Sequence, residues 1–297
     1  MTRRPKSKVR GPKSKVHSPR ITSSRLSPTE QRNPRSMHLD KLPLADAITL
    51  MLSEEVKVPG KVLAERSELE RAIRAIVRSF LRGGRLFYIG AGSSGRLGVL
   101  DASECPPTFR TPPEMVQGII AGGQKALWQS VEGAEDDAAA GGREIKSRRV
   151  SSRDVVVGIA ASGTTPFVWR ALQEAKQRRA STVLICFNPF LKIPRALRPS
   201  IVIAPNLGPE VLTGSTRLKA GTATKLILNL FTTLAMVRLG KVRSNLMIDL
   251  HPSNAKLRRR AVSIVRELTD ADAARAEAAL ERSGWVIKTA IARLSWR

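Results

Sequence analysis

The stretch that decides the fold is residues 90–107, GAGSSGRLGVLDASECPP, which directly follows the apolar run RLFYI at 85–89. Glycine and serine interrupt an apolar strand here, and helical patterning resumes behind them. Such a strand-to-helix turn gathers backbone N–H groups and hydroxyls at a helix N-terminus, where they favour an anion. The stretch therefore predicts a phosphate-binding turn, with an acid, Glu104, at the far end of the same segment.

Strands and helices alternate beyond this turn. Near-continuous apolar runs separated by helical patterning indicate a parallel sheet covered on both faces. We predict an α/β fold: a doubly wound, mainly parallel five-stranded sheet with N-terminal helices and a small C-terminal helical region. The expected strands are 86–90, 116–121, 154–161, 182–187 and 201–204, and the expected outer helices are 42–52, 62–81, 218–239, 254–268, 271–283 and 285–294. Thr269 and Asp270 are candidate caps for the penultimate helix.

Composition shifts divide the chain into four parts. Residues 1–27 are rich in Pro, Ser, Lys and Arg and bury too little apolar surface to offset chain ordering, so we expect a disordered basic tail. An N-terminal helical segment at 28–82, an α/β domain at 83–245 and a C-terminal helical region at 246–297 follow.

The chain is strongly basic, with 51 Lys+Arg against 25 Asp+Glu and a formal net charge of +26. Residues 1–37 hold eleven Lys or Arg and one acid, which leaves +10 on that stretch and +16 on the rest. Aromatic residues make up only 4% of the chain, so it offers few stacking platforms for single-stranded nucleic acid. We expect no specific nucleic-acid partner, only a loose association through the tail.

Cysteine and histidine usage narrows the chemistry. Cys105 and Cys186 are the two cysteines, and no hydrophobic signal segment accompanies them, so a cytoplasmic setting is expected. No stretch approaches the roughly 20 apolar residues of a membrane span. The three scattered histidines give little material for a metal site or a Ser-His-Asp triad. Acid–base chemistry is therefore expected from carboxylates.

The pattern Gly90-x-Gly92-x-x-Gly95 also matches the dinucleotide fingerprint. That fingerprint requires an acid at the end of the next strand, to hold the ribose hydroxyls. The next expected strand ends in Ala-Gly-Gly without an acid, and Glu114 precedes it. This mismatch counts against a dinucleotide.

A second loop resembles the first. The strand at 154–161 runs into Ser162-Gly-Thr-Thr-Pro166, where Thr165 is a plausible N-cap and Pro166 suits the first helical position. Parallel strands bring such loops to one edge of the sheet, where ligands of these folds bind. These residues taken singly could be ordinary turn residues, but two matching loops favour a phosphate site.

Two groups of acids could carry the chemistry. Glu104 is expected near the end of the helix that leaves the first turn, where the helix dipole and an apolar wall would favour a protonated carboxyl. The cluster EGAEDD at 132–137 could equally be a solvated helix start. Residues 213–221, TGSTRLKAG, either cap their own helix or add hydroxyls and cations, with Glu210, to a sugar-phosphate pocket.

Four motifs together resemble the N-acetylmuramic acid 6-phosphate etherases, which are built on a sugar isomerase (SIS) domain. They are GAGSSGRLGVLDASECPPTF, VEGAEDD, VGIAASGTTPFV and EVLTGSTRLKAGTATKLILNLFTTLAMVRLGKV. TEQRNP at 29–34 is also similar to the family's N-terminal segment. The resemblance extends from about residue 28 to the C-terminus, so the basic tail falls outside it.

The resemblance implies cleavage of the D-lactyl ether of N-acetylmuramic acid 6-phosphate without metal or cofactor, in a cytoplasmic homodimer. The family's proton donor falls on Glu104 and its second glutamate on Glu135. The implied route opens the sugar, removes the C2 proton, expels lactate from C3 and adds water. The implied binding residues are Ser93, Ser94, Gly95, Ser162, Gly163, Thr164, Thr165, Glu210, Ser215, Thr216 and Lys219.

The chain departs from the family pattern at two loop positions. The family commonly reads GAGTSGR and ASGRTPY, whereas this chain has Ser93 and Thr164. The threonine removes a positive charge from the second loop and puts an anion contact there in doubt. Two alternative functions stay open: a non-catalytic sugar-phosphate-sensing SIS regulator, and a sugar-phosphate isomerase.

Overall fold

The computed structural model describes residues 22–23 and 26–295. Its centre is a parallel five-stranded sheet in the order β3-β2-β4-β5-β7. These strands confirm the five expected ones, with shorter ends in most cases. They are β2 Leu86–Gly90, β3 Val116–Ile120, β4 Val155–Ile159, β5 Ser181–Ile185 and β7 Ile201–Ile203.

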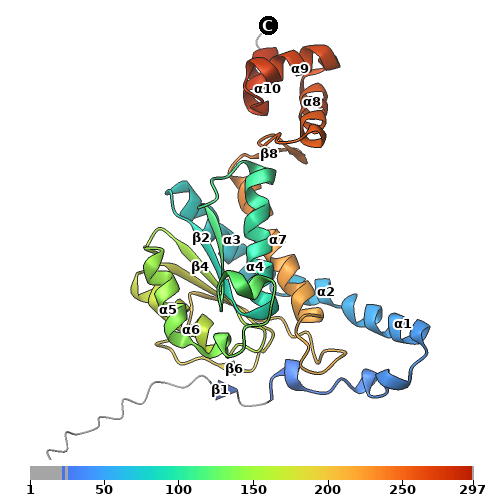
Figure 1. Ribbon diagram of the computed structural model, residues 1–297, viewed down its shortest axis with the longest axis vertical. Coiled ribbons are helices and arrows are strands. Elements are labelled where there is room, and N and C mark those ends of the chain that lie inside the picture. Colours follow the sequence, from blue (N-terminus) through green and yellow to red (C-terminus); the bar gives the residue numbers. More distant parts are fainter. Residues whose placement is uncertain (1–21, 24–25, 296–297) are drawn as a thin grey trace, which may run out of the picture.

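Helices cover both faces of the sheet, as the near-continuous apolar strands require (Figure 1). Leu86 and Tyr88 face one layer of helices, while Phe87 and Ile89 face the other, and all four are fully buried. The first layer holds α3 Arg66–Leu81, α4 Gly92–Phe109 and α7 Lys219–Arg238; the second holds α5 Ala138–Ser147 and α6 Pro166–Gln177. The doubly wound prediction is confirmed.

The chain changes direction across the sheet between β2 and β4, which are neighbours. From β2 the chain passes through α4 to the edge strand β3, whereas from β4 it passes through α6 to β5 on the other side. The connections that follow β2 and β4 therefore run to opposite sides. In open α/β sheets, ligands bind at such a switch point, outside the carboxyl ends of the strands.

The N-terminal segment begins with three short 3-10 turns and continues into helices. The expected helix at 62–81 is two helices: α2 buries Val58 and Val62, whereas α3 turns a separate stripe that includes Leu69 and Ile76 toward the sheet. In Figure 1, α1 projects away from the sheet. The elements are η1 Pro28–Glu30, η2 Pro34–Ser36, η3 Leu39–Lys41, α1 Leu44–Glu55 and α2 Val58–Leu63.

The C-terminal helices form a lobe with its own small apolar core (Figure 1). A hairpin, β8 Val242–Arg243 and β9 Leu246–Met247, leads into α8 Ala255–Thr269, α9 Ala273–Arg282 and α10 Ile287–Ser295. The predicted caps of the penultimate helix are wrong. Asp272 caps α9 by accepting from the backbone N–H of Arg275 at 2.8 Å, because Asp270 takes a left-handed conformation that ends α8.

Two further expectations need correction. Thr22–Ser23 lies in the stretch expected to be disordered, yet it forms a short strand, β1, that pairs with β6, Leu191–Lys192. Residues 1–21 and 24–25 of the tail lie outside those described. By length and composition α7 could cross a membrane, contrary to expectation, but half of its apolar window is buried in the protein. Its packing on the sheet accounts for its apolar character.

Candidate functional site

The two hydroxyl-rich loops lie side by side at the carboxyl ends of β2 and β4. These strands are paired in register up to Gly90 and Ile159, the residues at which both strands end. The first loop enters α4 and the second enters α6, as the sequence predicted. The structure thus brings the predicted hydroxyls together at one edge of the sheet: Ser93, Ser94, Ser162, Thr164 and Thr165.

The helices that begin at these loops both lack a side-chain cap. Ala91 precedes α4 and has no side chain that can accept, while Thr165 precedes α6 without a cap bond from its hydroxyl. The first backbone N–H groups of a helix have no partner within the helix and attract anions. Two uncapped helix starts at neighbouring strand ends therefore offer backbone N–H groups that can bind an anion.

Glycine permits the close packing of both loops. Gly95 is buried against the next strand, where an added Cβ would lie 2.6 Å from Ile120 Cγ1 and 2.8 Å from the carbonyl oxygen of Gly90. Gly163 has a φ of +80°, which other residues rarely adopt. These two predicted binding residues set the backbone path of the loops.

Hydrogen bonds hold the second loop in shape. The hydroxyls of Ser162 and Thr164 are 2.9 Å apart. Trp169 Nε1 donates to the carbonyl oxygen of Gly163 at 2.7 Å, and Asn188 Nδ2 donates to that of Ser162 at 3.3 Å. Sequence reasoning missed Trp169 and Asn188, although Asn188 directly follows an expected strand, at the sheet edge where ligands bind.

A third loop, after β3, joins the site through Arg96. Arg96, near the start of α4, donates from Nε to Leu127 O and from Nη2 to Gln129 O, both at 3.2 Å. The loop continues to the short turn η5, Ala134–Asp136, which packs against α6 and carries the exposed Glu135. The neighbouring Asp137 caps α5 by accepting from Ala140 N at 2.8 Å. For that acid, the alternative of a solvated helix start is therefore correct.

Glu104 lies elsewhere on α4. Ten residues separate it from Ser94, which corresponds to about 15 Å along the helix axis. Its side chain is exposed, and α4 continues past it to Phe109. The apolar wall expected around this carboxyl is therefore absent from the described part of this chain.

The buried carboxyl of this helix is Asp101. Tyr88 Oη on β2 donates to Asp101 Oδ2 at 2.9 Å, and Thr232 Oγ1 on α7 donates to Asp101 Oδ1 at 3.2 Å. Burial raises the pKa of Asp101 to about 6, although both hydrogen bonds oppose that rise. Burial also raises the pKa of the Cys105 thiol to about 12, so this cysteine stays a protonated, packed side chain.

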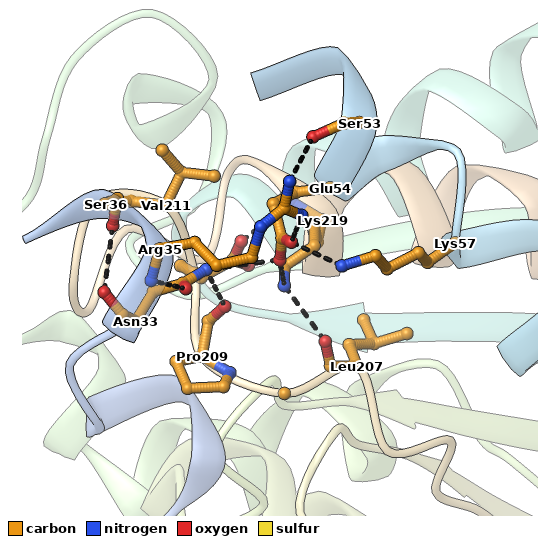
Figure 2. A network of polar contacts seen from close by, with 12 residues as sticks. Asn33, Arg35, Ser36, Ser53, Glu54, Lys57, Leu207, Pro209, Val211 and Lys219 are labelled. Atoms are coloured by element: carbon orange, nitrogen blue, oxygen red, sulfur yellow. Dashed lines mark hydrogen bonds and ion pairs between the residues drawn. The ribbon is translucent and has the colours of Figure 1, made fainter. Parts of the chain in front are cut away.

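Two other predicted binding residues have structural partners. Glu210 accepts from the backbone N–H groups of Lys219 at 3.0 Å and Ala220 at 2.9 Å, so it caps α7. Burial raises the pKa of Glu210 despite these bonds. Lys219 Nζ donates to Glu54 Oε2 at 2.9 Å and to Leu207 O at 3.0 Å (Figure 2). The remaining predicted hydroxyls of this loop, Ser215 and Thr216, are half-buried.

No group of three or more His, Cys, Asp or Glu side chains gathers as a metal site within residues 22–23 and 26–295. The chemistry that the described residues offer is anion binding by hydroxyls and backbone N–H groups, with carboxylates for proton transfer.

Two family models match the chain. Residues 68–176 match the glucokinase regulatory protein N-terminal SIS domain, and residues 244–293 match the C-terminal lid domain of glucokinase regulatory protein. A phosphoheptose isomerase from Francisella tularensis has a similar fold, with a TM-score of 0.50 at 15% identity. That alignment covers 66% of this chain and 100% of the isomerase chain, and it supports the fold alone.

Curated relatives resemble the chain over most of its length. The N-acetylmuramic acid 6-phosphate etherase of Gloeobacter violaceus is 53% identical over 263 residues, which is 89% of this chain and 85% of that protein. The etherase of Cutibacterium acnes is 50% identical over 90% of this chain and 87% of its own, and that of Pasteurella multocida is 49% identical over 90% and 88%. The chain therefore belongs to the N-acetylmuramic acid 6-phosphate etherase family.

Proposed function

We propose that this protein cleaves the D-lactyl ether of N-acetylmuramic acid 6-phosphate to give N-acetylglucosamine 6-phosphate and D-lactate, in the recycling of cell-wall amino sugars. Relatives that share 53% and 50% of their aligned residues with this chain are named N-acetylmuramic acid 6-phosphate etherase. The structural observation that carries the proposal is the pair of uncapped helix starts at the ends of β2 and β4. They suit a sugar phosphate, because backbone N–H groups and hydroxyls bind its phosphate oxygens without a metal.

The phosphate binds, in this proposal, to Ser93 and Ser94 of the first loop and to Ser162, Thr164 and Thr165 of the second. Gly95 and Gly163 hold the two backbones in place. The loop that ends at α7 extends the pocket through Ser215 and Thr216, and its shape depends on Glu210 and Lys219, which fix the start of that helix.

Glu135 removes the proton from C2 of the opened sugar, and the electron pair forms a C2–C3 double bond as the C3–O bond of lactate breaks. Glu104 donates the proton that the departing lactate oxygen takes up. Water then adds at C3 and a proton returns to C2, so the net reaction consumes one water. Two separate carboxylates suit this division, because one can remove the C2 proton while the other serves the leaving oxygen.

We further propose a cytoplasmic homodimer. Four apolar side chains at helical spacing are 50–77% exposed, which is unusual for such a row: Leu44, Ile48 and Leu52 on α1, and Val56 directly after it. An apolar groove of about 1330 Å³ runs between α2, α3 and α7. Leucines line it together with four arginines, Arg66, Arg74, Arg78 and Arg238. The α1 row is about 18 Å long, as is the groove wall between Leu226 and Arg238. Two copies can thus form a dimer in which the apolar row of each α1 lies in the groove of the other copy.

Release of D-lactate from N-acetylmuramic acid 6-phosphate, measured with a lactate dehydrogenase assay, tests the activity. We expect lactate and N-acetylglucosamine 6-phosphate in equal amounts. Glu104→Gln and Glu135→Gln should each reduce the rate at least a hundredfold. Normal turnover by both variants would overturn the two roles.

The match to glucokinase regulatory protein keeps a sugar-phosphate sensor as the second candidate. Tight binding of the sugar phosphate with no lactate would favour that function. An isomerised sugar without lactate would favour an isomerase.

A further inference from the structure

The N-terminal segment at 26–36 lies at the edge of the sheet where the strands end. β7 leaves the sheet at the same edge as β4 and β5, because Ile203 pairs with Ile185 and Ile185 pairs with Ile159. Figure 1 shows the segment, in blue, at the end of the domain opposite the C-terminal lobe. The segment is therefore close to the loops that follow the strands.

Three hydrogen bonds attach this segment to the loop at 204–218, which follows β7 and ends at α7. They join the Ser36 hydroxyl to Val211 O at 2.7 Å, Asn33 Nδ2 to Pro209 O at 3.3 Å, and the backbone N–H of Gly214 to Thr29 O at 3.0 Å. Gly214 has a φ of +77° and directly precedes Ser215 and Thr216. The segment thus holds the turn from which these two hydroxyls follow.

Asn33 is buried, and both polar atoms of its side chain are hydrogen-bonded. Besides bonding Pro209, Nδ2 donates to Glu54 Oε2 at 3.1 Å, and Oδ1 accepts from the backbone N–H of Arg35 at 3.0 Å (Figure 2). The same Glu54 oxygen accepts from Lys219, the first residue of α7. Asn33 therefore contacts the middle of the loop directly and, through Glu54, the helix start at which the loop ends.

The chain also contacts the surroundings of the loop after β4. Thr22–Ser23 pairs with Leu191–Lys192. A Cβ added to Gly163 would lie 2.7 Å from Leu191 Cδ2, so the side chain of Leu191 packs against that loop. The described N-terminal residues thus reach two of the loops that the proposed site uses.

We propose that Asn33 is a positioning residue for the sugar phosphate, because it holds the loop at 204–218 in the shape that presents Ser215 and Thr216 to the sugar. This inference rests on the proposed function. A loop that is fixed before the ligand arrives loses less conformational freedom on binding, which strengthens binding. Glu104 and Glu135 lie on other elements, so the loss of Asn33 should weaken binding and leave the rate of the bound substrate unchanged.

Asn33→Asp tests the proposal. The carboxylate has nearly the same size and can still accept from Arg35 N, but it has no hydrogen to donate to Pro209 O or to Glu54. In the lactate assay, KM for N-acetylmuramic acid 6-phosphate should rise about fivefold or more, while kcat stays within about twofold. A role in stability alone would instead reduce the amount of active protein, so that kcat would fall and KM would stay the same.

Ser36→Ala is the second variant, because it removes the bond to Val211 O without adding a charge. Its matched control is Ser53→Ala, since the Ser53 hydroxyl accepts from Arg35 Nη2 at 3.1 Å instead of bonding the loop. Ser36→Ala should raise KM, and Ser53→Ala should leave it unchanged. Wild-type KM in both Asn33→Asp and Ser36→Ala overturns the proposal, and so do equal changes in the two serine variants.

Binding of N-acetylglucosamine 6-phosphate, measured by isothermal titration calorimetry, separates this proposal from the proposed function. The Kd should rise in Asn33→Asp and Ser36→Ala but not in Ser53→Ala. If the wild type binds this sugar phosphate and releases no lactate, the proposed reaction is wrong, and the Kd values still decide the role of Asn33. If the wild type binds no sugar phosphate, both proposals are overturned.

Discussion

Lys219, at the first position of α7, directs its ammonium onto Glu54 of α1, with 2.9 Å between Nζ and Oε2 (Figure 2). Both side chains are buried. Burial opposes a charge on Glu54, yet hydrogen bonds from Lys57, Lys219 and Arg35 outweigh it and lower the pKa of this carboxyl to about 2. The pair joins the N-terminal segment to the α/β body, beside the loop that ends at α7.

Glu54→Gln should destabilise the fold. The substitution leaves the ammonium of Lys219 buried beside a neutral amide, and removing one partner of a buried pair costs about 3–5 kcal/mol. The measurement is the free energy of unfolding in urea at pH 7. Because the folded pKa lies below the ordinary 4.5, the wild-type advantage is present above pH 4.5 and is lost as the pH falls toward 2.

Lys57→Met is the matched control for that pair. Lys57 also bonds Glu54, at 2.6 Å, but its side chain is 53% exposed. Exposed ion pairs contribute about 1 kcal/mol or less. An equal loss from Glu54→Gln and Lys57→Met would contradict the role assigned to Lys219.

Asp101 should make the free energy of unfolding fall as the pH rises, which is opposite to the effect of Glu54. Burial raises its pKa from 3.8 to about 6, so between these values the folded state holds a proton that the unfolded state has lost. Stability should therefore fall by up to ~3 kcal/mol as the pH rises from 4 to 6. The groups that face Asp101 are Tyr88 on β2, Thr232 and Lys225 on α7, and Glu104 on its own helix.

Urea unfolding of the wild type and of Asp101→Asn between pH 4 and pH 7.5 measures this effect. The asparagine cannot ionise, so the difference in stability between the two proteins should shift with pH in favour of the variant as the pH rises. A constant difference across the range would show that Asp101 does not titrate there.

Gly95→Ala should damage the phosphate site. The new methyl group would lie 2.6 Å from Ile120 Cγ1 and 2.8 Å from Gly90 O, so the start of α4 must move away from the sheet. We expect a loss of about 1–3 kcal/mol in stability. The displaced loop should raise KM for the sugar phosphate at least tenfold, as measured in the lactate assay.

Gly60→Ala is the control for that substitution. Gly60 lies within α2 and has no atom within 4 Å of an added Cβ, so alanine should stabilise the fold by about 0.4–1 kcal/mol and leave KM unchanged. An unchanged KM for Gly95→Ala as well would count against the first loop as the phosphate site.

The double substitution Ile48→Glu and Leu52→Glu should convert the dimer into a monomer. Both side chains are at least half exposed within one chain, so the folded chain should keep its stability while the apolar contact with a second copy is lost. Sedimentation velocity measures the change. Thr49→Glu, which adds a charge to the same helix outside the apolar row, should remain dimeric, and a dimeric double variant would exclude α1 as the contact.

Several features could be predicted from the sequence because local patterns determine them. The strands are continuous apolar runs, and the strand-to-helix turns are marked by glycine and hydroxyl residues, so the sheet and the two loops after β2 and β4 were predicted at nearly the observed residues. The cap of α9 and the division between α2 and α3 were missed. These depend on one backbone conformation at Asp270 and on which side of each helix is buried.

The sequence by itself determined the α/β fold and the position of the two loops after β2 and β4, since each depends on residues close together in the chain, and its resemblance to a known family pointed to the two candidate glutamates. Only the tertiary structure decided where those residues lie. Lys219 contacts Glu54, which is 165 residues away in the sequence. On α4 the buried carboxyl is that of Asp101, and most of the length of the helix separates Glu104 from the loops. Such relations depend on how elements pack, and packing contacts between distant residues leave no local pattern in the sequence.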